Sequence, residues 1–149
     1  MSAKQQDKSN NKAQQQTTAS DVPQFFRLNI EVADLAAAAS FYAQLLGIQG
    51  SKQAGSRCYF NCGSVTLQVL DVSSSRQPHP AAKALYFTVG NLEAAYERAS
   101  ALHCVSRENV HDAPAGGIVV RPWGERSFYV EDPWKNPLCF VEEGTVYAG

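Results

Sequence analysis

The chain has 149 residues, of which 44% are apolar and 18% charged, and its formal net charge is −1. This length allows one domain with a proper core, or two small repeats that share one, and the composition is typical of a soluble globular protein. The basic residues are scattered and form no stripe that could neutralise phosphates, which argues against nucleic-acid binding. No apolar run approaches the ~20 residues needed to cross a bilayer.

Residues 1–21 form a polar N-terminal segment with one Met, a few Ala and no larger apolar side chain. Such a segment cannot bury enough surface to offset the entropy of ordering it, so we expect a disordered tail. The folded unit is then expected to be a single domain spanning residues 22–149. The N-terminus also lacks the apolar core of a secretory signal, which predicts a cytoplasmic protein whose four cysteines stay reduced.

Two segments of the folded part, 27–45 and 84–102, align without gaps and are identical at six positions. Each segment opens with alternating apolar and polar residues, as expected of a half-buried strand. Each continues with apolar residues at helical spacing, after a capping side chain at Asp34 or Asn91. Gly47 follows the first helix, where a left-handed cap is expected.

The downstream halves of the two copies also correspond. GSRCYF at 55–60 resembles GERSFY at 124–129, and the apolar stretch 65–71 corresponds to 136–142. The intervening residues, NCGS and DPWKN, are typical of hairpin turns. The sequence therefore predicts an α+β fold built by internal duplication from two tandem βαβββ modules. Module one spans about residues 24–73, and module two about residues 82–147.

The motifs that carry a family resemblance are 32-VADL-35 with 41-FYAQLLG-47 at the start and PWGERSFYVEDPWKNPL at the end. They resemble the vicinal oxygen chelate superfamily, which includes glyoxalase I, extradiol dioxygenases and bleomycin-resistance proteins. The resemblance implies that each module forms a curled mixed sheet with its helix on the convex side, and that the two modules line a shared cleft. Lys135 departs from the family, which usually has glycine there; a left-handed backbone would cost this side chain up to ~1 kcal/mol.

Strand alternation divides the sheet residues into two faces. An apolar set is expected to pack under the helices: Leu28, Ile30, Val32, Leu67, Val69, Leu85, Phe87, Leu138 and Phe140. A more polar set is expected to face the cleft: Arg27, Asn29, Glu31, Gln68, Tyr86 and Cys139. A plain solvent-facing side of the sheet is the alternative interpretation of this second set.

The resemblance assigns the four metal-ligand positions of metal-dependent relatives to Arg27, Ala84, Gln68 and Cys139. Arginine has no lone pair to donate and alanine offers no donor. Gln68 and Cys139 differ in softness and fall short of the three or four ligands of a stable site. We therefore expect neither a metal nor another cofactor.

No catalytic residue can be assigned from the sequence. Cys139 lacks a histidine in either first strand that could activate it as a nucleophile, so we expect it to line the wall of a metal-free pocket. His111, in a stretch that could close over the cleft, is a weak candidate for a catalytic role.

The residues expected to bind a ligand are Arg27, Asn29, Gln68, Tyr86, Cys139 and Trp123. Arg27 offers a fork for a carboxylate, phosphate or phenolate, although it could instead pair with Glu31. The aromatic residues offer flat surfaces on which a planar ligand can stack, although Trp123 could equally have the structural role of fixing its loop. These residues favour a non-catalytic binder of a planar or anionic small molecule, resembling the bleomycin-resistance proteins.

The alternative function is a lyase, isomerase or dioxygenase of the superfamily with a non-standard active site. The expected partners are a small-molecule ligand and a second copy of the chain, because two curled sheets leave edge strands that proteins usually cover. We expect neither nucleic acid nor membrane as a partner.

Overall fold

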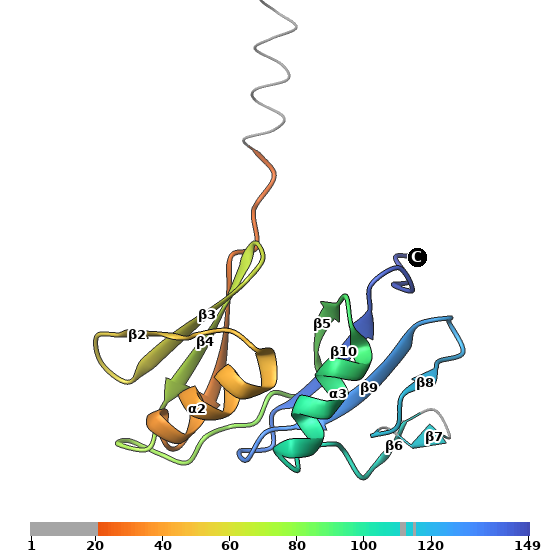
Figure 1. Cartoon of the computed structure of the whole chain (residues 1–149). Helices are drawn as coiled ribbons and strands as arrows, with labels where there is room; N and C mark the ends of the chain where they lie inside the picture. The colour runs from red at the N-terminus through yellow and green to blue at the C-terminus, as the bar shows by residue number, and fades with distance from the viewer. Residues whose placement is uncertain (1–20, 111–112, 115) are drawn as a thin grey trace, which may run out of the picture.

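The computed structural model describes residues 21–110, 113–114 and 116–149 (Figure 1). The expected disordered tail, apart from its last residue, and the catalytic candidate His111 lie outside the described residues. Within these ranges, neither helix is long and apolar enough to cross a membrane.

Module one contains β1 (Arg27–Val32), α2 (Leu35–Leu46), β2 (Ser51–Gln53), β3 (Arg57–Cys62) and β4 (Val65–Asp71). Its four strands form one sheet in the order β1-β4-β3-β2. β1 runs parallel to β4, and the other neighbouring strands are antiparallel. The parallel pair requires a crossover connection, which α2 begins.

Module two contains β5 (Leu85–Val89), α3 (Leu92–Ala101), β8 (Val119–Val120), β9 (Arg126–Glu131) and β10 (Pro137–Glu142). Its strand order, β5-β10-β9-β8, repeats that of module one, again with a single parallel pair. Figure 1 shows each helix lying against one face of its own sheet. The predicted α+β fold with two βαβββ modules and mixed sheets is confirmed.

A short ladder of β6 (Asn109–Val110) and β7 (Ala113–Pro114) was not predicted. It lies between α3 and β9, where module two has a longer connection than module one has between α2 and β3. The two copies therefore differ most in this insertion.

The local signals at the helix ends are confirmed. The Asp34 side chain accepts a hydrogen bond from the Ala37 N–H at 3.0 Å, and Asn91 caps α3 in the same way. Gly47 ends α2 with φ 68°, which glycine adopts without steric cost. Lys135 has φ 69°, so the lysine does occupy the left-handed position expected from the family pattern.

The two modules share one hydrophobic core, to which both helices and both sheets contribute. Apart from Leu28, the side chains predicted to lie under the helices belong to this core, with Leu85 and Phe87 partly buried at its edge. Leu28 is half-buried and borders a hollow between the modules. Strand alternation therefore assigned the helix-side face correctly.

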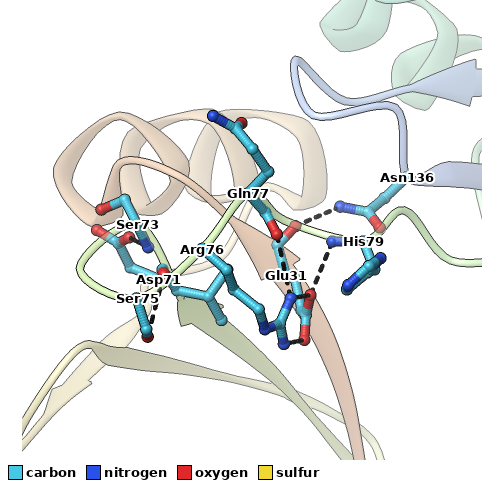
Figure 2. Close-up of polar contacts among 9 residues, drawn as sticks. Glu31, Asp71, Ser73, Ser75, Arg76, Gln77, His79 and Asn136 are labelled. Carbon is cyan, nitrogen blue, oxygen red and sulfur yellow. Dashed lines mark hydrogen bonds and ion pairs between the residues drawn. The ribbon is translucent and has the colours of Figure 1, made fainter.

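A buried polar network also joins the modules, and it is centred on the DPWKN turn. Tyr42 of α2 donates its hydroxyl proton to Asp132 at 2.6 Å. Asn136 is fully buried, and it donates to the Glu31 carbonyl at 2.9 Å (Figure 2). It also accepts from the Ala81 N–H at 2.8 Å. The turn that helped to identify the family thus ties β10 to the first helix, the first strand and the linker between the modules.

Candidate functional site

We use the term open face for the side of each sheet opposite its helix. Across the open face of module one, Gln68 of β4 lies in register with Asn29 of β1 and with Tyr59 of β3. The guanidinium carbon of Arg27 lies 5.0 Å from the ring centroids of Tyr59 and Phe26. The structure thus brings Arg27, Asn29 and Gln68 together on one sheet.

Gln68 is unusual because it is buried on this face. It is 5% exposed, and its Oε1 atom is buried without a hydrogen-bond partner among the described residues. A buried carbonyl oxygen that has lost water without gaining a donor costs about 1–3 kcal/mol. Such a group in a folded protein calls for an explanation, and a ligand that donates a hydrogen bond is one.

Glu31 pairs with Arg76 rather than with Arg27. Its carboxylate accepts a hydrogen bond from Arg76 Nη1 at 2.6 Å and another from the backbone N–H of His79 at 2.8 Å (Figure 2). The Arg76 hydrogen bond, followed by that of His79, lowers the pKa of Glu31 to about 2. Glu31 is therefore a weak base at neutral pH, and the Arg27–Glu31 pair considered from the sequence is not formed.

The corresponding row on the open face of module two consists of Tyr86, Cys139 and Tyr129, in the same register. The hydroxyl groups of Tyr86 and Tyr129 are hydrogen-bonded at 3.0 Å. Cys139 is fully buried beside Tyr129 and Val141. Burial raises the pKa of the Cys139 thiol to about 11, with side-chain hydrogen bonds to Ser127 and Tyr129 acting in the opposite direction. The thiol is protonated at neutral pH, which agrees with its exclusion as a nucleophile.

A hollow of about 570 Å³ lies beside this row. Tyr86 and Trp123, two of the predicted ligand-binding residues, line it together with Glu125 and Tyr147. The indole N–H of Trp123 donates to Glu125 Oε1 at 2.7 Å. The six predicted site residues therefore divide between the two modules: Arg27, Asn29 and Gln68 lie on the sheet of module one, and Tyr86 and Cys139 lie on the sheet of module two. Trp123 lies in the turn between β8 and β9, and Cys139 is fully buried.

Glu125 and Tyr147 were missed by the sequence analysis. Glu125 had a detectable signal, because it follows Trp123 by two residues in the PWGER motif. Tyr147 had none: it comes from the segment after the last strand, whose path the strand pattern does not determine.

A second hollow, of about 510 Å³, lies between the modules on the side of the helices. Its walls are mostly apolar and include Leu28 and Leu67 of module one and Leu85 and Phe87 of module two. Arg98 borders it and donates from Nε to the Leu45 carbonyl at 3.1 Å. None of the four metal-ligand positions lines this hollow.

The described residues do not fit the metal that metal-dependent relatives of the resembled superfamily carry. No three His, Cys, Asp or Glu side chains within residues 21–110, 113–114 and 116–149 come close enough together to hold a metal ion. At the four positions implied by the resemblance, Gln68 and Cys139 are the only possible donors, and they lie on different sheets.

Comparison with solved structures gives the same fold. Oxidase ChaP-H1 has 22% identity and a TM-score of 0.69, covering 86% of this chain and 100% of its own. A lactoylglutathione lyase from Agrobacterium tumefaciens has 23% identity and a TM-score of 0.59, covering 87% and 99%. A glyoxalase/bleomycin resistance protein from Albidiferax ferrireducens T118 has 20% identity and a TM-score of 0.64, covering 80% and 98%.

At these identities the structural likeness demonstrates a shared fold and nothing finer. No curated protein sequence matches the chain significantly. The family profile is decisive, because it matches residues 24–140, which is most of both modules. The chain belongs to the Glyoxalase/Bleomycin resistance protein/Dioxygenase superfamily.

Proposed function

We propose that the protein binds a small planar or anionic molecule without a metal, and that the open face of module one contains the binding site. The observation that carries this proposal is the buried Oε1 atom of Gln68, which has no partner among the described residues. Asn29 beside it is exposed, so its side chain can rotate to admit a ligand. A ligand N–H or O–H group would then satisfy the Gln68 carbonyl.

Arg27 supplies the positive charge in this proposal. Arg27 is exposed, and the ion pairs found among the described residues join Glu31 to Arg76, and Glu93 and Glu142 to Arg126. A guanidinium presents a planar fork of donors that suits a carboxylate or phenolate. The neighbouring Tyr59 ring, 5.0 Å from the guanidinium carbon, offers a flat surface for an aromatic ligand.

The proposal that no metal is needed depends on the residues at the four metal-ligand positions of the family. Arginine and alanine occupy two of the four family positions, and a fixed guanidinium would repel a divalent cation. Metal analysis of the purified protein tests this part. About one equivalent of tightly bound zinc, nickel, manganese or iron per chain would favour an enzyme of the superfamily instead.

The binding site is tested with an aromatic anion and its neutral isostere, 6-hydroxy-2-naphthoate and 6-hydroxy-2-naphthamide, after a thermal-shift screen of planar anions. Both probes carry a hydroxyl group that can donate to the Gln68 carbonyl. Wild type should bind the anion more tightly. Arg27→Ala should weaken anion binding about tenfold or more, with little change in melting temperature. Lys52→Ala, which removes the same charge from the exposed edge strand β2, is the control. Unchanged affinity in Arg27→Ala would refute the role of Arg27.

We also propose that the chain forms a homodimer. Among the described residues, β1 and β5 each lie at the end of a sheet, so each has one edge that pairs with no described strand. The exposed aromatic residues Phe25 and Phe26 lie just before β1, and the exposed Tyr86 lies on β5. Light scattering at tens of micromolar protein should give the mass of two chains, and the mass of one chain would contradict the proposal.

A further inference from the structure

The hollow between the modules, on the side of the helices, has walls that are mostly apolar. Its volume of about 510 Å³ lies within the range of about 300–1,000 Å³ that is usual for small-molecule pockets. Leu28 and Leu67 border it from module one, and Leu85 and Phe87 border it from module two. Ile48 also borders it and is exposed. Hydrocarbon placed against these walls would be removed from water, which is favourable.

Cys62 of β3 also lines this hollow and is only partly exposed. Burial raises the pKa of the Cys62 thiol, so the group is protonated and uncharged at neutral pH. The wall near Cys62 therefore carries no negative charge that would oppose an anion.

Arg98 of α3 is the one charged residue among the described residues that line this hollow. It is partly buried, and its Nε donates to the Leu45 carbonyl at 3.1 Å, near the C-terminal end of α2. Gly47 lies beside the guanidinium, because a Cβ atom at Gly47 would lie 3.5 Å from Arg98 Cζ. The hydrogen bond and this close contact hold the guanidinium at the wall of the hollow.

The two Nη groups of Arg98 remain available to a ligand. Within the described ranges, the arginines that form ion pairs are Arg76 and Arg126, so no described carboxylate neutralises Arg98. The Leu45 carbonyl occupies Nε alone. A guanidinium presents its N–H groups as a planar fork that matches the two oxygens of a carboxylate.

We propose that this hollow is a second binding site, and that it takes a medium-chain fatty acid in its carboxylate form. Arg98 would bind the carboxylate, and the apolar walls would cover the alkyl chain. One cationic side chain in an otherwise uncharged, mostly apolar hollow complements a ligand with one anionic end and a hydrocarbon body. The site lies on the helix side of the sheets, so it is separate from the proposed anion site on the open face of module one.

The experiment titrates the protein with octanoate and with its neutral counterpart octanamide, followed by calorimetry and ligand NMR. Wild type should bind octanoate about tenfold or more tightly, because the amide lacks the charge-assisted contact with Arg98. From butanoate through hexanoate to octanoate, the affinity should rise roughly two- to fourfold for each added CH₂ group. Equal affinities for octanoate and octanamide, or no rise along the series, would overturn the proposal.

Arg98→Gln removes the charge and the fork, and it should bring the affinities for octanoate and octanamide within about threefold of each other. Arg107→Gln is the matched control, because it makes the same substitution at an exposed position of module two outside this hollow. It should keep the preference for octanoate. An undiminished preference in Arg98→Gln would overturn the proposal.

Ile48→Glu keeps the proposal testable if Arg98→Gln fails to fold for want of the Leu45 contact. Ile48 is 37% exposed where it borders the hollow, so the protein should tolerate the substitution. The added carboxylate should weaken octanoate binding about tenfold and octanamide binding less than about threefold. Equal effects on the two ligands would overturn the proposal.

A second copy of the chain is the other possible cover for this hollow, since the exposed Phe25 and Tyr86 border it as well. In that case wild type should not bind octanoate, and Ile48→Glu should halve the mass found by light scattering. This outcome would overturn the proposal.

The two proposed binding sites can fail separately. Arg27→Ala should leave the affinity for octanoate unchanged, because Arg27 does not line this hollow. Arg98→Gln should leave the affinity for 6-hydroxy-2-naphthoate unchanged, because Arg98 lies on a helix of the other module. Loss of octanoate binding in Arg27→Ala but not in Arg98→Gln would overturn the second site and leave the first.

Discussion

The two open faces have the same backbone frame but opposite chemistry. In each module a row of three side chains crosses the first, last and third strands of the βαβββ unit in the same register. The rows are Asn29–Gln68–Tyr59 in module one and Tyr86–Cys139–Tyr129 in module two. The first row exposes an amide beside a guanidinium, whereas the second buries a thiol beside tyrosines and borders a hollow that contains a carboxylate.

The helix-side faces have not diverged in this way. Leu28 corresponds to Leu85, Val32 to Val89 and Leu67 to Leu138, and each of these positions packs on the helix side of its sheet. Packing against a helix tolerates only apolar side chains of suitable volume, so the duplicated core stays recognisable. The open face has no such constraint. Differences between the modules on that face therefore indicate where ligand chemistry can differ.

The turn before the last strand also differs between the modules. A substitution in the module-two turn should give the largest loss of stability among the variants considered. Asn136 in module two is fully buried and bonds to the backbone of both β1 and the linker. Asn136→Ala removes the side-chain partner of two part-buried backbone groups, the Glu31 carbonyl and the Ala81 N–H. We expect a loss of about 2–4 kcal/mol in the free energy of unfolding, measured by urea denaturation.

The control for this prediction is the corresponding hairpin of module one. Asn61 is exposed and accepts one hydrogen bond, from the Thr66 hydroxyl at 3.2 Å. Asn61→Ala should change the free energy of unfolding by no more than about 0.5 kcal/mol. Similar losses in the two variants would mean that the module-two turn does not join the modules as the structure indicates.

Features that depend on neighbouring residues in the sequence could be predicted, whereas contacts between distant segments could not. The capping residues Asp34 and Asn91 act on their own helices, and strand alternation is a local property, so short patterns were enough to predict them. The role of Asn136 was not predictable, because its partners at Glu31 and Ala81 are distant in sequence and the contact depends on how the modules pack.

For the candidate site, the sequence predicted which face of a strand each side chain occupies, but not the contacts between segments. Alternation identified which side chains occupy the open faces, including Asn29 and Gln68. It could not indicate that Cys139 would be covered, because burial on that face depends on tyrosine side chains from neighbouring strands. Nor could it bring Tyr147 to Glu125, since that contact is made by a segment with no periodic pattern.

Gln68 provides the second prediction, with an intermediate effect. If the buried Oε1 atom of Gln68 gains a hydrogen-bond donor only when a ligand binds, this unsatisfied atom lowers the free energy of unfolding of the ligand-free protein. Gln68→Met keeps a similar volume and removes the polar group. It should raise the free energy of unfolding by about 1 kcal/mol, which corresponds to roughly 2–4 °C in melting temperature for a chain of this size. It should also weaken binding of 6-hydroxy-2-naphthoate, whose hydroxyl group can donate to the Gln68 carbonyl.

Asn29→Met makes a comparable change at the exposed neighbour of Gln68 and should alter stability by no more than about 0.5 kcal/mol. Calorimetry on the three proteins without ligand gives the comparison. A marked loss of stability in Gln68→Met would show that the amide has a structural partner, and the binding proposal would lose its main support.

The smallest effect concerns charge at the end of the first strand of each module. Glu31 of β1 holds Arg76 and His79 of the linker, whereas the equivalent position in module two is Thr88, which is uncharged and borders the hollow. Only module one therefore has a carboxylate at this position that couples stability to pH. Arg76 is 43% exposed, so water screens the pair and its contribution should be modest.

The expected pH dependence follows from the lowered pKa of Glu31, about 2 against an ordinary value of 4.5. A carboxyl group with a depressed folded-state pKa stabilises the protein above its unfolded-state pKa, and this stabilisation is lost as the pH falls through the folded-state value. Urea denaturation from pH 7 to pH 2 should thus give a constant stability difference between wild type and Glu31→Gln above about pH 4.5, and this difference should shrink steadily as the pH falls toward 2. Glu97→Gln, at an exposed helix position, is the matched removal of one carboxylate away from this contact. If the difference for Glu31→Gln did not shrink over this range, Glu31 would not hold the linker through its charge, and the two modules would be alike at this position.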